Sequence, residues 1–200
     1  MPRALITGAA SGLGLALAQA MFTRGYAVIL VDRDGERLRS VVAGLARSDP
    51  DRVIGHALDL TDRQALAELV ASVVASGRLD VLINNAGITH RSLVERTDPK
   101  VFQTVMAVDW QAPVEMAVAC LPLLKRSGGG IINIGSMAGW MPVLGRAGYC
   151  SAKSALSQFF EVLRGEVAQY GVHILMVYPS FLDTPIETNA LGHDGQPAAH

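Results

Sequence analysis

Short apolar segments alternate with longer stretches of helical hydrophobic spacing, and this alternation limits the possible folds more than any other feature. The segments are apolar throughout, as strands are when helices cover both faces of a sheet. Strand–helix–strand units of this kind form parallel sheets. We therefore predict an α/β fold, a doubly wound and mostly parallel sheet with Rossmann-type topology and helices on both faces. Its six strands are expected at residues 4–7, 26–31, 53–58, 81–83, 131–134 and 172–177.

The stretches between these segments predict helices at residues 15–24, 36–46, 63–75, 101–125 and 149–170. Within residues 101–125 we expect Pro113 and Pro122 to interrupt the helix, because proline lacks the N–H that a helix interior uses. Residues 1–186 are expected to form a single Rossmann-type domain. Residues 187–200 are expected to begin a substrate loop or to form a flexible tail.

Charge and composition exclude several classes of protein. The 200 residues carry 17 basic and 18 acidic side chains, so no strong field attracts nucleic acid or an anionic membrane. Half of the residues are hydrophobic, which excludes a disordered chain. Two cysteines, Cys120 and Cys150, are too few for a disulfide framework. No long uncharged apolar run predicts a membrane span, and the histidines have no metal-ligand spacing. We expect a cytoplasmic protein with no metal site, no nucleic-acid partner and no membrane partner.

Residues 7–14 form a glycine-rich turn, Thr-Gly-Ala-Ala-Ser-Gly-Leu-Gly, between a predicted strand and a predicted helix. Glycine lets a backbone approach a pyrophosphate closely, and the helix N-terminus offers free N–H groups and a positive dipole end. The alternative is a turn that only packs the strand against the helix. We expect a dinucleotide to contact Gly8, Ser11, Gly12, Leu13 and Gly14.

Acidic residues follow the second and third predicted strands. Asp32 closes the second strand, where a carboxylate accepts hydrogen bonds from a ribose and repels a 2′-phosphate. NAD is therefore favoured, although Arg33 could contact a phosphate and NADP stays possible. Asp59, followed by Leu60, is expected in the cofactor site near the adenine. Asp59 could instead place its charge at the N-terminus of the next helix.

Tyr149 and Lys153 stand four residues apart and would share one face of a helix. The ammonium would favour the phenolate form of Tyr149. Ser136 ends the fifth predicted strand, where its hydroxyl could hold a carbonyl oxygen beside the phenol. A Tyr-x-x-x-Lys pair arises by chance on many helices. Chance does not explain it together with the glycine loop, Ser136 and the Asn-Asn-Ala-Gly turn at residues 84–87.

At these residues the sequence resembles the short-chain dehydrogenase/reductase family, and the resemblance covers essentially the whole chain. It implies hydride transfer between a nicotinamide dinucleotide and a carbonyl or secondary alcohol. Tyr149 would be the general acid in reduction and the general base in oxidation. Lys153 would bind the nicotinamide ribose and tune Tyr149, and Ser136 would orient the substrate oxygen.

The resemblance also implies further contacts. Asn85, Ala86 and Gly87 would line the cofactor cleft, with Pro179 in the same site. Thr184 would reach the nicotinamide carboxamide, or else cap a helix before Pro185. The substrate would be apolar because its expected neighbours are apolar, although each of these could be ordinary core: Met137, Trp140, Met141, Leu144 and Phe181.

Four features depart from the family pattern. Asp109 occupies the place of a catalytic asparagine. It could accept the same hydrogen bond, but its charge would draw on Lys153 and alter the proton relay; alternatively, it is a surface acid out of register. Ser180 stands where glycine usually follows Pro179, and Gly135 where serine is frequent. The chain ends at His200, so we expect a truncated form without the family's seventh strand.

The predicted helix at residues 149–170 carries an apolar stripe of Leu156, Phe159, Phe160 and Leu163. This stripe could be core, but in the family two such helices pack across a two-fold axis, which predicts a homodimer or homotetramer. A dinucleotide-sensing binding module with weakened catalysis is an alternative function, favoured by Asp109 and by the short chain. A nucleotide-sugar epimerase fits poorly, because its glycine spacing differs and it needs a larger substrate domain.

Overall fold

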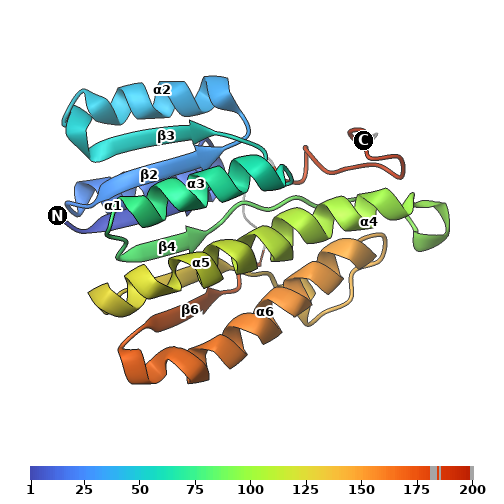
Figure 1. Ribbon diagram of the computed structural model, residues 1–200. Helices are drawn as coiled ribbons and strands as arrows, with labels where there is room; N and C mark the ends of the chain where they lie inside the picture. Colours follow the sequence, from blue (N-terminus) through green and yellow to red (C-terminus); the bar gives the residue numbers. More distant parts are fainter. Residues whose placement is uncertain (181–183, 185, 199–200) are drawn as a thin grey trace.

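The computed structural model describes residues 1–180, 184 and 186–198. Its single sheet has the order β3-β2-β1-β4-β5-β6, and every neighbouring pair of strands is parallel. This confirms the predicted doubly wound α/β fold with six strands. The arrowheads in Figure 1 point to one common edge of the sheet. The strands are β1 (Arg3–Thr7), β2 (Ala27–Asp32), β3 (Val53–Ala57), β4 (Val81–Asn84), β5 (Gly130–Ile134) and β6 (His173–Val177).

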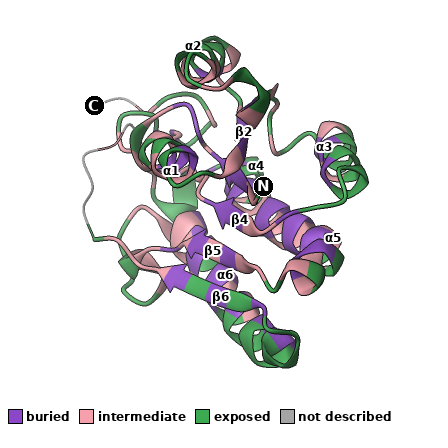
Figure 2. Cartoon of the chain, turned by 90° about the vertical axis from the view of Figure 1, so that its left-hand side faces the viewer, coloured by how far each residue is buried: buried purple, intermediate pink, exposed green. Residues whose placement is uncertain are grey.

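Helices cover the sheet on both sides, as Figure 2 shows with α1 and α3 on opposite faces. One buried cluster packs α1 and α2 against β1 and β2, and a larger one packs α3, α5 and α6 against the other face. The helices are α1 (Gly12–Thr23), α2 (Gly35–Ala46), α3 (Arg63–Ala75), α4 (Pro99–Met106), α5 (Ala112–Ser127) and α6 (Ala147–Val167).

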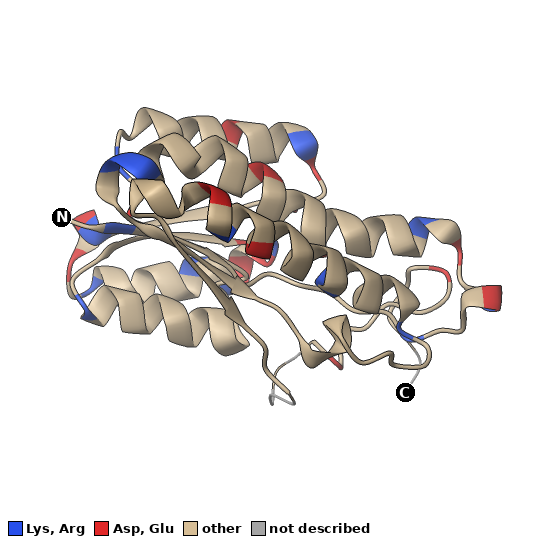
Figure 3. Ribbon diagram, turned by 90° about the horizontal axis from the view of Figure 1, so that it is seen from below, with Lys and Arg blue, Asp and Glu red and all other residues tan. Residues whose placement is uncertain are grey.

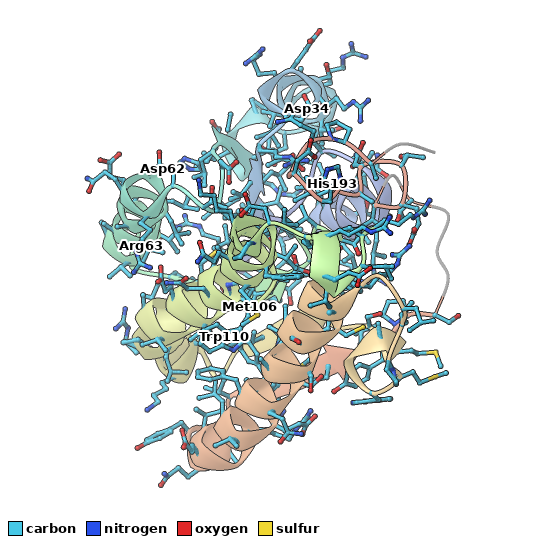
Figure 4. The ribbon with its side chains drawn as sticks, turned by 90° about the vertical axis from the view of Figure 1, so that its right-hand side faces the viewer. Asp34, Asp62, Arg63, Met106, Trp110 and His193 are labelled. Carbon is cyan, nitrogen blue, oxygen red and sulfur yellow. The ribbon has the colours of Figure 1, made fainter. Side chains whose placement is uncertain are left out.

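Aspartate side chains cap the starts of three helices, α2, α3 and α4. The Asp34 carboxylate accepts a hydrogen bond from the Arg37 N–H at the start of α2, and Asp62 accepts from the N–H groups of Gln64 and Ala65 at the start of α3. Both residues are labelled in Figure 4. Such caps satisfy N–H groups that have no partner inside the helix.

The prolines do not interrupt the fourth predicted helix where the sequence suggested, so that expectation was wrong. The helix instead changes type at a π-helical segment, Ala107–Gln111, which joins α4 to α5 with helical backbone angles at both junctions. Pro113 lies in the first turn of α5, directly after the π-helical segment. Pro122 lies inside α5. Met106 and Trp110, labelled in Figure 4, lie on either side of Asp109 in the sequence.

The two outer strands are not buried on both faces. Exposed side chains in β3 include Ile54, and those in β6 include Leu175. The central strands fit the expectation of full coverage better. Their one buried polar pair is Asn84 with Asn133: these residues are direct partners in the β4–β5 ladder, and the Asn84 Nδ2 donates to the Asn133 Oδ1 at 2.8 Å.

Residues 187–198 pack back onto the segment that follows β4. The Leu191 N–H donates to the Thr89 carbonyl at 2.9 Å, and the Arg91 N–H donates to the Leu191 carbonyl at 2.8 Å. Ala190 is buried. The division of the chain at residue 186, into a domain and a loop or tail, stays a prediction.

Basic and acidic residues are interspersed along the ribbon in Figure 3. Over the part of the chain that the structure describes, no helix has both the length and the apolar character to span a membrane. Within the same residues, no cluster of three or more His, Cys, Asp or Glu side chains could hold a metal ion.

Candidate active site

A cleft of about 950 Å³ lies at the carboxyl ends of the strands. Ligands of doubly wound sheets bind in this position. The cleft brings together residues from all six strand ends and from α6. Among the residues singled out from the sequence, it is lined by Gly8, Ser11, Gly12, Leu13, Gly14, Asp32, Arg33, Asp59, Leu60, Asn85, Ala86, Gly87, Ser136, Met137, Met141, Tyr149, Lys153, Pro179 and Thr184.

The glycine loop leaves no room for side chains at two positions. Gly8 has φ +66°, and a Cβ on it would lie 2.8 Å from the Asn85 Nδ2. A Cβ on Gly14 would lie 1.9 Å from the Gly8 carbonyl oxygen. Ser11 is the N-cap of α1, and among the described residues its side chain caps none of the first N–H groups. The start of α1 therefore presents free N–H groups, which suits a phosphate.

Thr7 and Asn85 hold the glycine loop against the turn after β4. The Thr7 Oγ1 accepts from the backbone N–H groups of Asn85 and Ala86 at 3.1 and 3.0 Å. The Asn85 Nδ2 donates to the carbonyls of Thr7 and Gly8 at 2.9 and 3.2 Å. The Asn-Asn-Ala-Gly turn therefore holds the glycine loop in place, and both segments line the cleft.

Asp32 lines the cleft and also braces the loop. Its Oδ2 accepts from the Ala10 N–H at 2.9 Å, and its Oδ1 accepts from the Asp34 N–H at 3.0 Å. Each carboxylate oxygen keeps a second lone pair for a ligand hydroxyl. Arg33 and Arg37 line the same end of the cleft, so this end carries both signs of charge.

Asp59 lines the cleft while its Oδ1 accepts from both the N–H and the hydroxyl of Thr61, each at 2.8 Å. The cap of α3 is Asp62 and not Asp59. The structural alternative for Asp59 is therefore a local turn and not a helix cap. Thr184 also lines the cleft, and residues 186–189, which follow it, form turns and no helix.

Tyr149 and Ser136 face the cleft from α6 and from the end of β5. Ser136 begins a short 3₁₀ turn, Met137–Gly139, and its Oγ accepts from the Ala138 N–H at 3.2 Å. The hydroxyl proton of Ser136 is thus left for another acceptor. The Lys153 Nζ lies 5.6 Å from the centre of the Tyr149 ring, on the same side of α6.

Lys153 and Asp109 form a buried ion pair behind Tyr149. The Lys153 Nζ lies 3.2 Å from the Asp109 Oδ2 and donates to the Ile134 carbonyl at 3.0 Å. The Asp109 Oδ1 accepts from the Ile88 N–H at 2.8 Å. Asp109 is 0% exposed and Lys153 is 3% exposed. The alternative of Asp109 as a surface acid is therefore excluded.

Burial and pairing oppose each other in this pair. Burial raises the pKa of Asp109, and it outweighs the lowering by the Lys153 charge and the Ile88 N–H. Burial lowers the pKa of Lys153, but the charges of Asp109 and Tyr149 together outweigh it, so the net pKa is raised. Lys153 therefore keeps its ammonium charge at the bottom of the cleft.

The expected apolar neighbours of the substrate divide into three groups. Met137 and Met141 line the cleft. Trp140 and Leu144 are 62% and 95% exposed and do not belong to the lining; the Trp140 ring packs on Tyr178 at 4.2 Å. Phe181 lies outside the described residues. None of the four described side chains is core, since all are substantially exposed.

Several cleft residues were not foreseen from the sequence. Arg91, Arg146 and Glu187 line its outer end, where the Arg146 guanidinium binds both carboxylate oxygens of Glu187. The carbonyl of Ile134 holds Lys153. No local motif signals these residues, because each contact joins segments far apart in the chain.

Comparison with known proteins agrees with this geometry. A family model described as short chain dehydrogenase matches residues 2–194. The chain is 34% identical over 198 residues to the dehydrogenase/reductase SDR family member 7B of Bos taurus, covering 96% of this chain and 61% of that protein. It is 36% identical over 196 residues to a dehydrogenase/reductase SDR family protein 7-like of Drosophila melanogaster, covering 96% and 60%.

A metagenomic short-chain oxidoreductase solved in complex with NADP superposes with a TM-score of 0.84 at 33% identity, covering 90% of this chain and 83% of that one. The chain spans about three fifths of the length of the curated relatives it matches. The family match extends over nearly the whole sequence and includes every element of the cleft described above. The chain therefore belongs to the short-chain dehydrogenase family.

Proposed function

We propose that the protein is an NAD(P)-dependent oxidoreductase that interconverts a carbonyl and a secondary alcohol. The observation that carries the proposal is that Ser136, Tyr149 and the buried Lys153 line one cleft together with the glycine loop. A buried ammonium beside a phenol is a place to exchange a proton with a substrate oxygen. The NADP complex of the metagenomic relative adds support for a nicotinamide cofactor.

The residues present fit a dinucleotide. A Cβ on Gly8 would collide with Asn85, and a Cβ on Gly14 would collide with the Gly8 carbonyl, so the loop keeps its tight shape only with glycine at both positions. The free N–H groups at the start of α1 suit the pyrophosphate, and Asp32 suits a ribose hydroxyl. Asn85, Ala86, Gly87, Pro179 and Thr184 would hold the nicotinamide end. When bound, the nicotinamide supplies or accepts the hydride.

The chain's own residues handle the proton and the orientation of the substrate. Ser136 donates its free hydroxyl proton to the substrate oxygen and fixes it beside Tyr149. Tyr149 gives its phenolic proton to that oxygen in reduction and removes it in oxidation. Lys153, charged and anchored by the Ile134 carbonyl, stabilises the phenolate that forms and offers its remaining proton to a ribose hydroxyl.

Asp109 gives this site its own character. The Asp109 carboxylate contacts Lys153 where the family has the neutral amide of an asparagine. The ammonium charge of Lys153 therefore attracts two anions, the Asp109 carboxylate and the Tyr149 phenolate. We expect a working relay with an altered pH dependence. A binding module that senses the dinucleotide is the second candidate, because the same pairing weakens the phenolate.

Asp32 makes NAD the proposed cofactor, with NADP possible because Arg33 and Arg37 line the same end. Met137 and Met141 suit an apolar carbonyl or alcohol as the substrate. A homodimer or homotetramer is proposed from the family resemblance alone, because Leu156, Phe160 and Leu163 of the apolar stripe lie in the core. Sedimentation that gives a monomer at every concentration would reject the assembly.

The test compares Tyr149→Phe with Tyr170→Phe, a matched control on an exposed tyrosine whose ring packs under Lys125. Turnover of a panel of ketones and secondary alcohols is followed by nicotinamide absorbance with both dinucleotides. Dinucleotide binding is measured separately by fluorescence.

We expect Tyr149→Phe to lower kcat by at least about 10²-fold with binding retained, because a positioned proton donor contributes that much. Tyr170→Phe should behave like the wild type. Equal turnover in Tyr149→Phe and wild type would overturn the mechanism. Binding without turnover by the wild type would select the sensing module, and the absence of binding would reject both.

A further inference from the structure

The helix that carries Tyr149 begins without a cap of its own. Arg146 is the N-cap of α6, and among the described residues its side chain caps none of the first N–H groups. The first intrahelical bond runs from the Cys150 N–H to the Arg146 carbonyl at 2.9 Å. The N–H groups before Cys150 need partners from elsewhere, because a helix cannot satisfy its own first turn.

A distant histidine provides one of these partners. The His90 Nε2 lies 2.9 Å from the Gly148 backbone nitrogen, and a backbone N–H can only donate. His90 is fully buried, and its ring packs edge-on against Phe102 of α4, with 5.4 Å between the ring centres. Tyr149 is the residue after Gly148, so this bond acts next to the proposed proton donor.

The hydrogen bonds around His90 fix its tautomer. The Nε2 must be the unprotonated nitrogen because it accepts from Gly148, so the neutral ring carries its proton on Nδ1. The Nδ1 lies 3.4 Å from the Ser92 Oγ, which lies 2.7 Å from the Thr97 Oγ1. The Thr97 hydroxyl donates to the Leu93 carbonyl at 2.7 Å. The His90 Nδ1–H therefore donates to the Ser92 hydroxyl, and the Ser92 hydroxyl donates to the Thr97 hydroxyl.

Packing holds the imidazole in place from three sides. The backbone on either side of His90 is pinned by the two hydrogen bonds between Leu191 and the residues at 89 and 91. A Cβ on Gly148 would lie 2.9 Å from the Phe102 Cδ1 and 3.2 Å from the His90 Nε2. Only glycine fits between the two rings, so the helix start, the imidazole and α4 form one tightly packed unit.

The charges near His90 oppose its protonation. Burial lowers the pKa of His90, and the Arg146 charge lowers it further. Arg146 is in turn paired with Glu187, which also binds Arg91. From α4 the facing group is the uncharged Phe102, and Ser92 and Thr97 are uncharged as well.

We infer that His90 is a positioning residue for Tyr149. Its Nε2 holds the Gly148 N–H, and proton uptake by the imidazole breaks this bond, displaces the start of α6 and slows turnover at acid pH. An imidazolium presents N–H to N–H at this contact, which repels. The statement about turnover rests on the proposed oxidoreductase function, whereas the tautomer and the contact do not.

The first experiment needs no turnover. Long-range ¹H–¹⁵N spectra of the full chain, with His90 assigned by comparison with His90→Gln, report the tautomer and the titration. We expect a neutral ring at pH 7 with its proton on Nδ1. A proton on Nε2, or a charged ring at pH 7, would overturn the inference.

The second experiment compares kcat for carbonyl reduction, the direction in which Tyr149 must be protonated, across pH for His90→Leu, His90→Gln and the control His56→Gln, with dinucleotide binding measured alongside. Leucine removes the acceptor, and we expect kcat to fall by about tenfold or more because the reacting group shifts. The glutamine Oε1 can accept from Gly148 without titrating, so His90→Gln should keep most of kcat and lose the acid decline. His56→Gln should keep that decline.

An unchanged kcat in folded His90→Leu would contradict the inference, and so would a wild-type acid decline in His90→Gln. If His90→Leu fails to fold, the pH profile of His90→Gln decides. If the wild type turns over no substrate, the proposed function fails, and the tautomer experiment alone decides on His90.

Discussion

At the scale of single residues, the site depends on how Lys153 keeps a charge that burial disfavours. Two acceptors hold the ammonium, the Asp109 carboxylate and the Ile134 carbonyl. These partners offset the free energy that it costs to bury the ammonium. Removal of Asp109 would leave a buried charge without its counter-ion, which is strongly unfavourable. The pair therefore controls both the charge and the position of Lys153.

Asp109→Asn should shift the alkaline limb of the pH–rate profile to lower pH. Asp109 raises the pKa of Lys153 against the lowering by burial, so its removal lets burial dominate and the ammonium loses its proton earlier. The profile of kcat from acid to alkaline pH checks this. Glu68→Gln, which removes an exposed carboxylate on α3, is the control and should leave the profile alone. An identical profile in Asp109→Asn would remove Asp109 from the relay.

Asp32→Ser should change cofactor preference. The substitution removes the negative charge that would repel a 2′-phosphate and leaves Arg33 and Arg37 at the same end of the cleft. We expect the ratio of NADPH to NADH affinity to rise by about tenfold or more, since like charges cost several kcal/mol. The loop loses the same brace for both ligands, so the ratio reports the lost repulsion of the 2′-phosphate together with the lost hydrogen bond to the ribose hydroxyl. Fluorescence titration with the two dinucleotides measures it, and a constant ratio would count against the role of Asp32.

The candidate site was predictable at residues that carry a local pattern and not elsewhere. Tyr149 and Lys153 share a helix face, and the glycine loop has a fixed spacing, so position in sequence nearly determines position in space. Nothing local shows that Asp109 is buried or that His90 meets Gly148, since these contacts cross the chain. The neighbours of Trp140 and Leu144 likewise depend on how residues 137–146 fold over the cleft.

At the scale of elements, two glycines on neighbouring helices have opposite roles. Gly14 in α1 faces the Gly8 carbonyl, and Gly44 in α2 has open space around its Cβ position. We expect Gly14→Ala to abolish measurable dinucleotide binding, because the new Cβ would push the Gly8 carbonyl and the glycine loop out of place. Gly44→Ala should preserve binding and raise the free energy of unfolding by about 0.5–1 kcal/mol, the usual gain in a helix interior. Thermal unfolding and fluorescence titration measure both; retained binding in Gly14→Ala would contradict the steric argument.

The elements themselves were largely predictable because apolar strands and helical spacing dominate the sequence. The error concerned residues 101–125, where proline suggested breaks. Pro113 and Pro122 both lie within α5, and the helix instead changes type at Ala107–Gln111, which contains no proline. A π-helical segment has no composition of its own, and such segments are frequent at functional sites, as this one is around Asp109.

At the scale of the whole molecule, Glu187 ties residues 187–198 to the body of the fold through Arg146 and Arg91. Hydrogen bonds from Arg146 lower the pKa of Glu187 below its ordinary value of 4.5. The resulting stabilisation is complete above that value and is lost as the pH falls through the lowered pKa.

Glu187→Gln should therefore speed amide hydrogen exchange at Leu191 and Ala198 by about two- to fivefold at neutral pH, the range for a partly exposed ion pair. The difference between variant and wild type should shrink in acid, where the wild-type carboxylate is also neutral. Exchange read by mass spectrometry tests this, with Glu68→Gln as control. Equal exchange rates at neutral pH would show that this ion pair does not hold the segment.

The hydrogen bond between the side-chain amides of Asn84 and Asn133, inside the sheet, favours one register of β4 against β5. If either strand slipped by one residue, the two amides would no longer face each other, and two buried polar groups would lose their hydrogen bond. The native register is therefore more stable than a shifted register through this hydrogen bond as well as through apolar packing. Asn85 follows β4 directly, and Ser136 lies two residues after the end of β5. A shift in register would therefore move these two cleft residues relative to each other.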